Sequence, residues 1–406
     1  MKRRDVLKNI SLLPLAGGLA GTLVPAAKTV AAPIAKRDVF TELGLRTFIN
    51  AAGTYTSMTA SLMPDEVMEA INQASKEYVM LDEVQDKAGA KIAELCHAEA
   101  AMVTAGCWSA IVLGTAGVIT GADPKKVGLL PNLEGTALKS EVIIQKSHSV
   151  GYDHAVTNTG AKLVIVETAE EAERAINDKT AMTWFLNKEV ASGKIKHEEW
   201  LQISKKHNIP AMIDMAADVP PVENLWKYND MGFDLVCISG GKAMCGPQST
   251  GLLMGKKDLI AAARLNGPPG GGNIGRGMKV NKEEIIGMYV ALDSYIKRDH
   301  AKEWKMWEGK IATINNAVKS ITAVKTEIVI PPVANHTPSL EIRWDNSKIK
   351  LTKEEMGLKL RNGYPSIETV SWEKDNSIRV TVFMLKPGQE KVVASRIKEE
   401  LLAASV

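Results

Sequence analysis

Residues 235–246 read Leu235-Val236-Cys237-Ile238-Ser239-Gly240-Gly241-Lys242-Ala243-Met244-Cys245-Gly246. The first four residues are apolar and predict a buried strand, which ends in a serine and two glycines and then presents a lysine. Earlier in the chain, a second apolar strand over residues 210–215 carries a single acidic residue, Asp214. An acid at one strand end and a lysine just beyond the next indicate a site at the edge of a sheet.

Lys242 and Asp214 together meet the requirements of pyridoxal 5′-phosphate (PLP) chemistry. A lysine amine forms a Schiff base with the aldehyde of this cofactor, and a carboxylate keeps the pyridine nitrogen protonated so that the ring accepts electrons. Ser239 offers a hydroxyl to the cofactor phosphate. Taken singly, Asp214 is more often a helix cap and Lys242 a solvated loop residue, but their combination favours the cofactor. We therefore predict PLP, with Lys242 catalytic and Asp214 bound to the pyridine nitrogen.

A second candidate element for cofactor binding is the loop over residues 104–110, which reads Thr-Ala-Gly-Cys-Trp-Ser-Ala. It follows a predicted strand and enters a helix of small residues over 111–119. Free backbone N–H groups and the helix dipole at such a start attract anions. Alone, the loop is equally an ordinary strand-to-helix turn. With Lys242 present, we expect Gly106, Cys107 and Trp108 to hold the cofactor phosphate.

Two histidines are candidates for contact with the cofactor ring. His148 comes just after a predicted strand over residues 141–145, so its flat side chain is a candidate to lie over the pyridine. His154 is a weaker candidate, and a surface position is the alternative for both.

Several cations are candidates for anion binding. Arg276 and Lys279 lie in a glycine-rich loop over residues 267–282, which is otherwise a flexible linker. We expect Lys279 to contact the cofactor and Arg276 the substrate. Arg343 and Arg379 lie on predicted strands near the C-terminus, and Arg379 is a predicted clamp for a substrate carboxylate.

The order of predicted elements defines the fold class. Apolar strands alternate with helices from about residue 98 to 255, which predicts an α/β domain with a mostly parallel sheet covered on both faces. From about residue 300 the pattern changes to that of a small α+β domain. We predict an entry segment over 36–60, a large cofactor-binding domain over 61–298 and a small C-terminal domain over 299–406.

Residues 1–35 are expected to be an export signal. A charged segment with the pair Arg3-Arg4 precedes a modestly apolar stretch over 10–24, and small residues follow. This apolar stretch is too short and too rich in glycine to span a membrane comfortably. A plain secretory signal is the alternative to the twin-arginine type. Twin-arginine export carries folded proteins, so a periplasmic or otherwise exported enzyme would acquire its cofactor before export.

Composition excludes some classes of partner. The formal net charge is +3, and cleavage near Ala32 would remove five basic residues and one acidic residue, so that 3 − 5 + 1 leaves about −1. Such a chain gives no argument for nucleic acid. The four cysteines lack Cys-x-x-Cys spacing, so no metal site is predicted. We expect a small-molecule substrate and no membrane anchor in the mature form.

Several motifs resemble one family. They are residues 49–53, 98–101, 104–110, 213–214, 239–248, 275–284 and 363–367. Over about residues 40–404 the chain resembles the bacterial selenocysteine synthase superfamily of fold-type I PLP enzymes, closest to its D-glucosaminate-6-phosphate ammonia-lyase-like branch. The resemblance implies an aspartate-aminotransferase-like large domain, a small C-terminal domain and a homodimer or higher homo-oligomer with active sites at subunit interfaces. It assigns Lys242, Asp214, Ser239 and residues 106–108 the roles given above.

The predicted activity is that of a PLP-dependent lyase acting on an amino acid or an amino-sugar acid similar to D-glucosaminate. The substrate amine would displace Lys242 to form an external aldimine, and the freed lysine would remove the Cα proton. Loss of a β-hydroxyl group and then of ammonia would give a 2-keto acid. A PLP-dependent racemase or aminotransferase is the first alternative, and a non-catalytic binding protein on the same fold is the second.

Overall fold

The structure is a computed structural model that describes residues 37–371 and 376–406. The export signal predicted over residues 1–35 lies outside the described residues. A short N-terminal unit ends at Thr47, and residues 48–406 form the main unit. In the first unit, α1 (Val39–Glu42) begins at Asp38, whose carboxylate accepts hydrogen bonds from the backbone N–H groups of Phe40 and Thr41.

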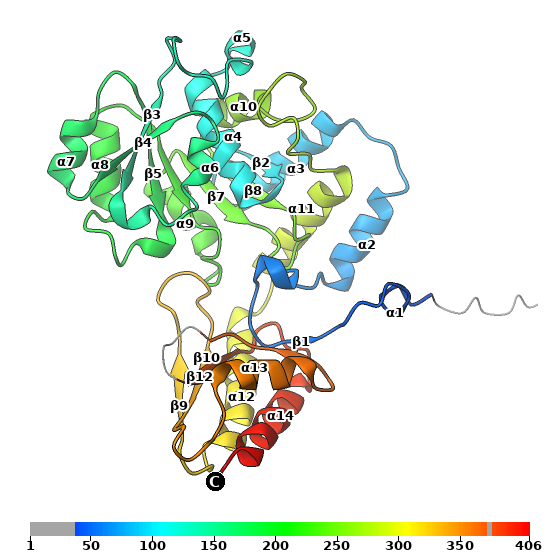
Figure 1. Cartoon of the computed structure of the whole chain (residues 1–406). Helices are drawn as coiled ribbons and strands as arrows, with labels where there is room; N and C mark the ends of the chain where they lie inside the picture. The colour runs from blue at the N-terminus through cyan, green and yellow to red at the C-terminus, as the bar shows by residue number, and fades with distance from the viewer. Residues whose placement is uncertain (1–36, 372–375) are drawn as a thin grey trace, which may run out of the picture. The chain divides into compact units, whose positions relative to one another are not determined.

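A seven-stranded sheet forms the centre of the larger domain (Figure 1). Its strands, in spatial order, are β2 (Ala100–Thr104), β8 (Gly251–Gly255), β7 (Leu235–Ser239), β6 (Ala211–Asp214), β5 (Thr180–Leu186), β3 (Glu141–Gln145) and β4 (Lys162–Val166). All neighbouring pairs are parallel except the two pairs that contain β8. The predicted α/β fold with a mostly parallel sheet is confirmed.

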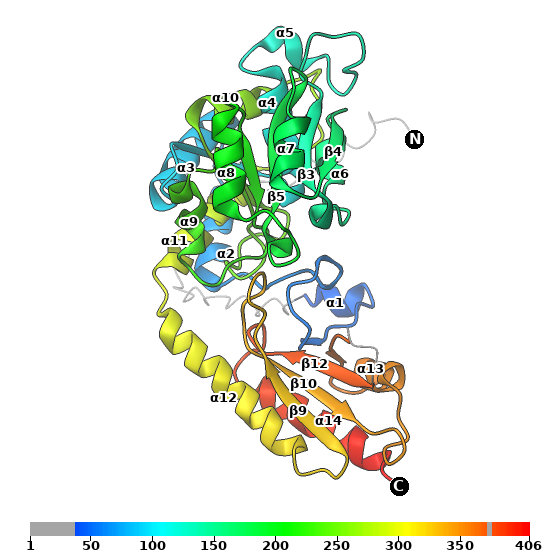
Figure 2. The same cartoon turned by 90° about the vertical axis from the view of Figure 1, so that its left-hand side faces the viewer.

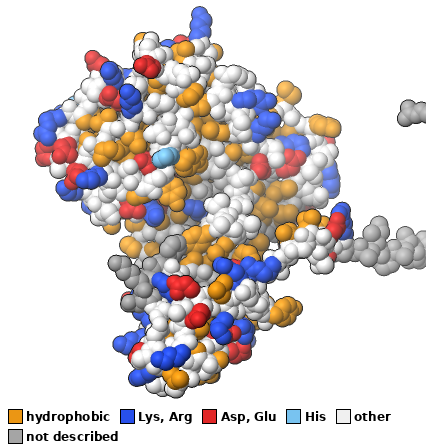
Figure 3. Space-filling view, viewed as in Figure 1, with side chains coloured by type: hydrophobic (Ala, Val, Ile, Leu, Met, Phe, Trp, Pro, Cys, Tyr) orange, Lys and Arg blue, Asp and Glu red, His pale blue; other side chains and the backbone are white. Residues whose placement is uncertain are grey.

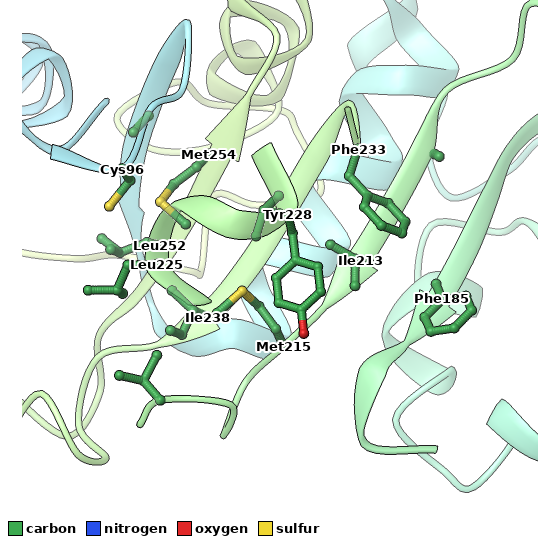
Figure 4. Close-up of a cluster of buried hydrophobic side chains, with 14 of the residues drawn as sticks. Cys96, Phe185, Ile213, Met215, Leu225, Tyr228, Phe233, Ile238, Leu252 and Met254 are labelled. Carbon is green, nitrogen blue, oxygen red and sulfur yellow. The ribbon is translucent and has the colours of Figure 1, made fainter. Parts of the chain in front are cut away.

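Helices cover both faces of this sheet, because alternate residues of each strand point to opposite faces. Phe185 and Ile213 belong to one buried cluster, whereas their neighbours Trp184 and Met212 belong to the other. Figure 4 shows part of the first cluster. Its helices are α3 (Leu81–Leu95), α7 (Ala169–Ala175), α8 (His197–Lys206), α9 (Asn224–Met231) and α11 (Lys282–Ile296). The second face carries α4 (Gly106–Thr120), α6 (His154–Thr157) and α10 (Lys257–Leu265).

The second domain is built on a three-stranded antiparallel sheet, β12 (Ser377–Thr381), β10 (Ser339–Trp344) and β9 (Val324–Val329) (Figure 2). Its helices are α12 (His300–Val318), α13 (Lys353–Asn362) and α14 (Gln389–Ala403). The predicted entry segment contributes to this domain, since β1 (Ile49–Asn50) pairs with β11 (Ile367–Glu368) and Ile49 joins the same buried cluster.

The remaining elements are short. They are η1 (Thr56–Met58), α2 (Asp65–Ala74), α5 (Pro124–Val127), η2 (Lys146–His148) and η3 (Asn187–Glu189). In the part of the chain that the structure describes, no helix combines the length and the apolar character needed to cross a membrane.

Candidate active site

The predicted site residues follow strand ends at one edge of the large sheet. In the sheet register, Asp214 at the end of β6 lies beside Leu186 of β5 and Cys237 of β7. Gly251 at the start of β8 lies between Thr104 of β2 and Ser239 of β7. The sheet therefore brings Asp214 and the starts of the segments that carry Gly106 and Lys242 to a common edge, as parallel strands require.

Asp214 is a buried carboxylate on the face of the sheet that α4 covers. It is 3% exposed, and its Oδ1 accepts hydrogen bonds from the Ala216 N–H at 2.9 Å and from the Cys107 thiol at 3.4 Å. Within residues 37–371 and 376–406, Oδ2 accepts no hydrogen bond. One oxygen is thus fixed and the other is left for a donor.

Burial and nearby hydrogen-bond donors shift the pKa of Asp214 in opposite directions. Burial raises the pKa of this carboxyl group above its ordinary value, while the Ala216 N–H, the Cys107 thiol and the charge of Lys242 act in the opposite direction. A cationic partner such as a pyridinium would stabilise the ionised form further.

Lys242 lies in a tightly packed turn just after β7. The turn is closed by hydrogen bonds from the Gly246 N–H to the Gly240 carbonyl at 3.0 Å and from the Ser61 hydroxyl to the Gly241 carbonyl at 2.6 Å. A Cβ atom at Gly241 would lie 2.5 Å from the Gln248 Cα, so only glycine fits there. Lys242 itself is half-buried. The turn therefore holds the base of the lysine firmly.

The start of α4 offers uncapped backbone donors. The residue before the helix, Ala105, has no side chain that caps the first turn, and Gly106 adopts a φ of +82°. Strand β8 comes close to this helix start, since a Cβ atom at Gly251 would lie 2.4 Å from the Gly106 carbonyl carbon. Trp108 is 41% exposed at this helix start. Such a terminus suits a phosphate group.

These observations fit PLP, which needs three contacts. The cofactor aldehyde requires an amine, the pyridine nitrogen a carboxylate and the phosphate a set of N–H and O–H donors. The amine would come from Lys242 and the carboxylate oxygen from Oδ2 of Asp214. The phosphate donors would be the N–H groups at the start of α4 and the Ser239 hydroxyl. These individual roles stay predictions that the geometry supports.

His148 does not fit its predicted place over the cofactor ring. Its side chain is fully buried, its ring meets Phe185 edge-on at 4.4 Å between centroids, and Nδ1 accepts the Leu186 N–H at 3.1 Å. Phe185 belongs to the face covered by α8, whereas Asp214 faces α4. The short helix η2 turns the histidine into the core, so we correct its role to a packing residue.

The predicted anion-binding cations have varied surroundings. The side chains of Arg276 and Lys279 are exposed, and so is that of His154. Arg379 donates from Nε to Oε2 of the buried Glu341 at 2.8 Å, which gives it a structural role inside the small sheet. Arg343 pairs with Glu327 at 3.0 Å. The pairing with Glu341 does not favour the predicted role of Arg379 as a clamp for a substrate carboxylate.

A buried polar network beside Asp214 was not predicted from the sequence. Asp218 is 2% exposed, and its Oδ2 accepts a hydrogen bond from the Asn187 amide at 3.0 Å. The same amide donates to the Tyr228 hydroxyl at 2.6 Å, while the His197 Nε2 lies 2.6 Å from the Asn187 Oδ1. The sequence feature that could have indicated this network is the second acidic residue, Asp218, four positions after Asp214.

A cavity of about 140 Å³ lies next to the lysine turn. Ala243 and Cys245 line it on one side, and Arg298, Glu303 and Lys310 bring charged groups to it from α12 and the turn before it. A larger cavity of about 270 Å³ lies beyond β3 and β4 and contains none of the predicted site residues. The smaller cavity therefore adjoins the turn that follows Lys242, but Lys242 itself does not line it.

Comparison with known proteins identifies the family. The model of the aminotransferase class-V family matches residues 61–286. The chain belongs to this family. The cofactor of this chain is PLP, so the predicted cofactor is confirmed, and the chain is an enzyme of the fold-type I group. The roles of Lys242 and Asp214 stay predictions.

Individual relatives agree with this assignment. D-glucosaminate-6-phosphate ammonia lyase of Salmonella typhimurium is 27% identical over 378 residues, which cover 89% of this chain and 97% of that protein. The L-seryl-tRNA(Sec) selenium transferase of Caldanaerobacter subterraneus is 23% identical over 88% of this chain and 83% of its own length. A solved structure of D-glucosaminate-6-phosphate ammonia-lyase matches with a TM-score of 0.79 and 25% identity, covering 91% of this chain and 99% of that chain.

Proposed function

We propose that this enzyme is an ammonia-lyase acting on a 2-amino-3-hydroxy acid, such as D-glucosaminate or a related amino-sugar acid. The 3-hydroxyl group leaves as water, and one water then hydrolyses the resulting imine to release ammonia and give a 2-keto acid. The observation that carries the proposal is the similarity to the Salmonella ammonia lyase across 97% of that protein. The combination of Lys242, Asp214 and the α4 start agrees with it, because Cα–H cleavage requires a base and an electron-withdrawing group.

Each residue of the site has a defined task in this reaction. Bound PLP would withdraw electrons from the substrate Cα. Lys242 would take the Cα proton on Nζ once its amine is free, and the half-buried setting of the lysine limits access of water. Asp214 would hold a proton between Oδ2 and the pyridine nitrogen. The α4 start and Ser239 would orient the cofactor through its phosphate.

The visible absorbance of the purified protein tests the cofactor and its lysine. We expect a band from the bound cofactor in the native protein and its loss or shift in Lys242→Ala, because only the lysine amine joins covalently to the PLP aldehyde. Lys391→Ala, at an exposed position in α14 of the small domain, serves as the control and should keep the native band. An unchanged band in Lys242→Ala would remove this lysine from its role.

Release of products tests the reaction type. The native enzyme should release ammonia and a 2-keto acid in equal amounts from D-glucosaminate or from its 6-phosphate. Retention of the amine with inversion at Cα would identify a racemase, and transfer of the amine to an added keto acid would identify an aminotransferase. Either result would contradict the lyase proposal.

We also propose export by the twin-arginine route, on the basis of Arg3-Arg4 and the apolar stretch after them. Replacing both arginines by lysine in the full chain should leave the protein in the cytoplasm. Unaltered export of that variant would favour a plain secretory signal. An exported enzyme would rarely meet sugar phosphates, so we expect kcat/KM to be higher for D-glucosaminate than for its 6-phosphate.

We propose in addition that the active form is a homo-oligomer. The segment between α2 and α3 is exposed and ends in three apolar residues, with Tyr78 102% and Met80 73% exposed. Figure 3 shows hydrophobic side chains gathered over α2. Large exposed apolar groups of this kind are typical of interfaces. Analytical ultracentrifugation should show a dimer or larger species that a Tyr78→Glu, Met80→Glu variant weakens, and a monomeric native enzyme would contradict the proposal.

A further inference from the structure

Two buried thiols flank the carboxylate of Asp214, and only one of them contacts it by a hydrogen bond. Cys107, 7% exposed in the first turn of α4, places its Sγ 3.4 Å from Oδ1. Cys237, fully buried on β7, is the register neighbour of Asp214 and makes no hydrogen bond to it within the described residues. The two cysteines are therefore matched in chemistry and burial but differ in this contact.

The Cys107 thiol is held as a hydrogen-bond donor. Burial raises the pKa of this thiol well above its ordinary value, and the negative charge of Asp214 acts in the same direction. A thiolate would repel the carboxylate, so the protonated form persists at neutral pH. The other titratable groups that interact electrostatically with Asp214 are Lys242, Asp218 and Cys237.

The contact also joins two parts of the cofactor site. Cys107 belongs to the helix start whose N–H groups face the predicted phosphate position, and its side chain reaches the carboxylate predicted to bind the pyridine nitrogen. The close approach of Gly251 to the Gly106 carbonyl fixes the helix start against the sheet. A single residue therefore connects the two ends of the site.

We propose that Cys107 is a positioning residue whose thiol fixes Oδ1 of Asp214 and so presents Oδ2 to the pyridine nitrogen of PLP. The proposal rests on PLP as the cofactor but not on the lyase reaction. Without the thiol, Oδ1 would retain only the Ala216 N–H, and the carboxylate would be free to turn about its χ2 bond. Its ionised form would also lose a donor that favours it.

Cofactor titration of three variants tests the proposal. Cys107→Ala removes the donor, Cys107→Ser restores a donor in the same place, and Cys237→Ala removes a matched thiol that lacks the contact. PLP is added to cofactor-free protein, and its dissociation constant and the pH midpoint of its visible band are measured. No substrate is used, so the result does not depend on the lyase proposal.

We expect Cys107→Ala to bind PLP about three- to tenfold more weakly, the range that loss of one hydrogen bond gives. The pH midpoint of the visible band should rise by about half a unit or more, because a less protonated pyridine withdraws fewer electrons from the Schiff base. Cys107→Ser should stay close to the native values, and so should Cys237→Ala.

Equal changes in Cys107→Ala and Cys237→Ala would overturn the proposal, because they would trace the effect to core packing. An unchanged pH midpoint in Cys107→Ala would overturn it as well. Thermal unfolding of each cofactor-free variant identifies any that fail to fold. If the alanine variant does not fold, the comparison of Cys107→Thr with Cys107→Val provides the same test at nearly constant side-chain volume.

Discussion

At the scale of single residues, the contribution of the Asp214 charge can be measured with a variant of nearly the same shape. Asp214→Asn keeps an oxygen that accepts the Ala216 N–H and the Cys107 thiol but removes the negative charge. We expect PLP to remain bound while kcat falls by roughly 10²-fold or more, as loss of a positioned acid–base group does. Ammonia release measures kcat.

The exposed Asp230, which pairs with His97 at 3.0 Å, supplies the control. Asp230→Asn should leave kcat within about twofold of native, since surface ion pairs contribute little. Equal kcat values for Asp214→Asn and the native enzyme would contradict the predicted role of Asp214.

The carboxyl group of Asp218 should lower the free energy of unfolding as the pH rises. Burial raises the pKa of its carboxyl group from 3.8 to about 6, and its Oδ1 has no hydrogen-bond partner within the described residues. The folded state therefore holds this proton more tightly than the unfolded state, and stability is lost as the pH rises from about 4 through 6. Between pH 4.5 and 7 the loss from this group is about 2 kcal/mol.

Asp218→Asn removes that pH-dependent loss while it keeps an acceptor for the Asn187 amide. Urea unfolding of the cofactor-free protein at pH 4.5 and at pH 7 measures the free energy of unfolding of the native protein and of the variant. The variant should gain stability relative to native at pH 7 more than at pH 4.5. An equal difference in unfolding free energy between variant and native protein at both pH values would contradict the raised pKa of Asp218.

The residue types of the site could be predicted from the sequence, but the directions of their side chains could not. Lys242 after Ser-Gly-Gly and Asp214 at a strand end form a rare combination. The direction of His148 depends on the short helix η2, which no periodicity indicates. The thiol of Cys107 turns toward Asp214 because both lie on the α4 face, a relation that needs the sheet order.

At the scale of elements, the contact of β8 with the start of α4 depends on glycine. In Gly251→Ala the new Cβ would lie 2.5 Å from the Cys107 nitrogen, and backbone atoms cannot move aside cheaply. We expect a loss of unfolding free energy of about 1–3 kcal/mol, together with weaker PLP binding. Chemical unfolding and PLP titration measure the two effects.

Gly309 in α12 is the control, because a Cβ atom there meets nothing within 4 Å. Gly309→Ala should stabilise the protein by up to about 1 kcal/mol through helix propensity and leave PLP binding unchanged. Stabilisation by Gly251→Ala as well would show that the helix start adapts.

Strands were easier to predict than short helices. The predicted strand over 141–145 matches β3 of the structure, since buried parallel strands form continuous apolar runs. Among the described residues, five α-helices were not predicted: α1 and α5, which have four residues each, and α9, α10 and α13, which have eight to ten. Their stability comes from packing, although the capping box of Thr352 and Glu355 marked the start of α13.

At the scale of the whole molecule, the small domain contacts the turn that carries the site. The Asn335 N–H, in the loop between β9 and β10, donates to the Ala217 carbonyl at 2.7 Å. Ala217 lies between Asp214 and Asp218, so a shift of the small domain would act on both carboxylates. No sequence pattern indicated this contact, because it joins segments more than a hundred residues apart.

Stability of the whole fold should fall at mildly acid pH. Burial lowers the pKa of His148 and of His197 from 6.5 to about 4, so both are neutral in the folded state and accept protons more readily when unfolded. The stability that they support is present above pH 6.5 and is lost as the pH falls toward 4. Between pH 7 and 5 each histidine accounts for a loss of about 2 kcal/mol, and Asp218 offsets about 1 kcal/mol of the sum.

The cofactor-free protein should therefore be roughly 2–3 kcal/mol less stable at pH 5 than at pH 7 from these three groups. His148→Gln should lower the stability at both pH values, because the Leu186 N–H loses its acceptor, yet it should flatten the pH dependence by about 2 kcal/mol. His154→Gln, at an exposed position, should keep the native slope. A slope that survives in His148→Gln would mean that this histidine is already protonated in the fold, and its burial against Phe185 would then need another explanation.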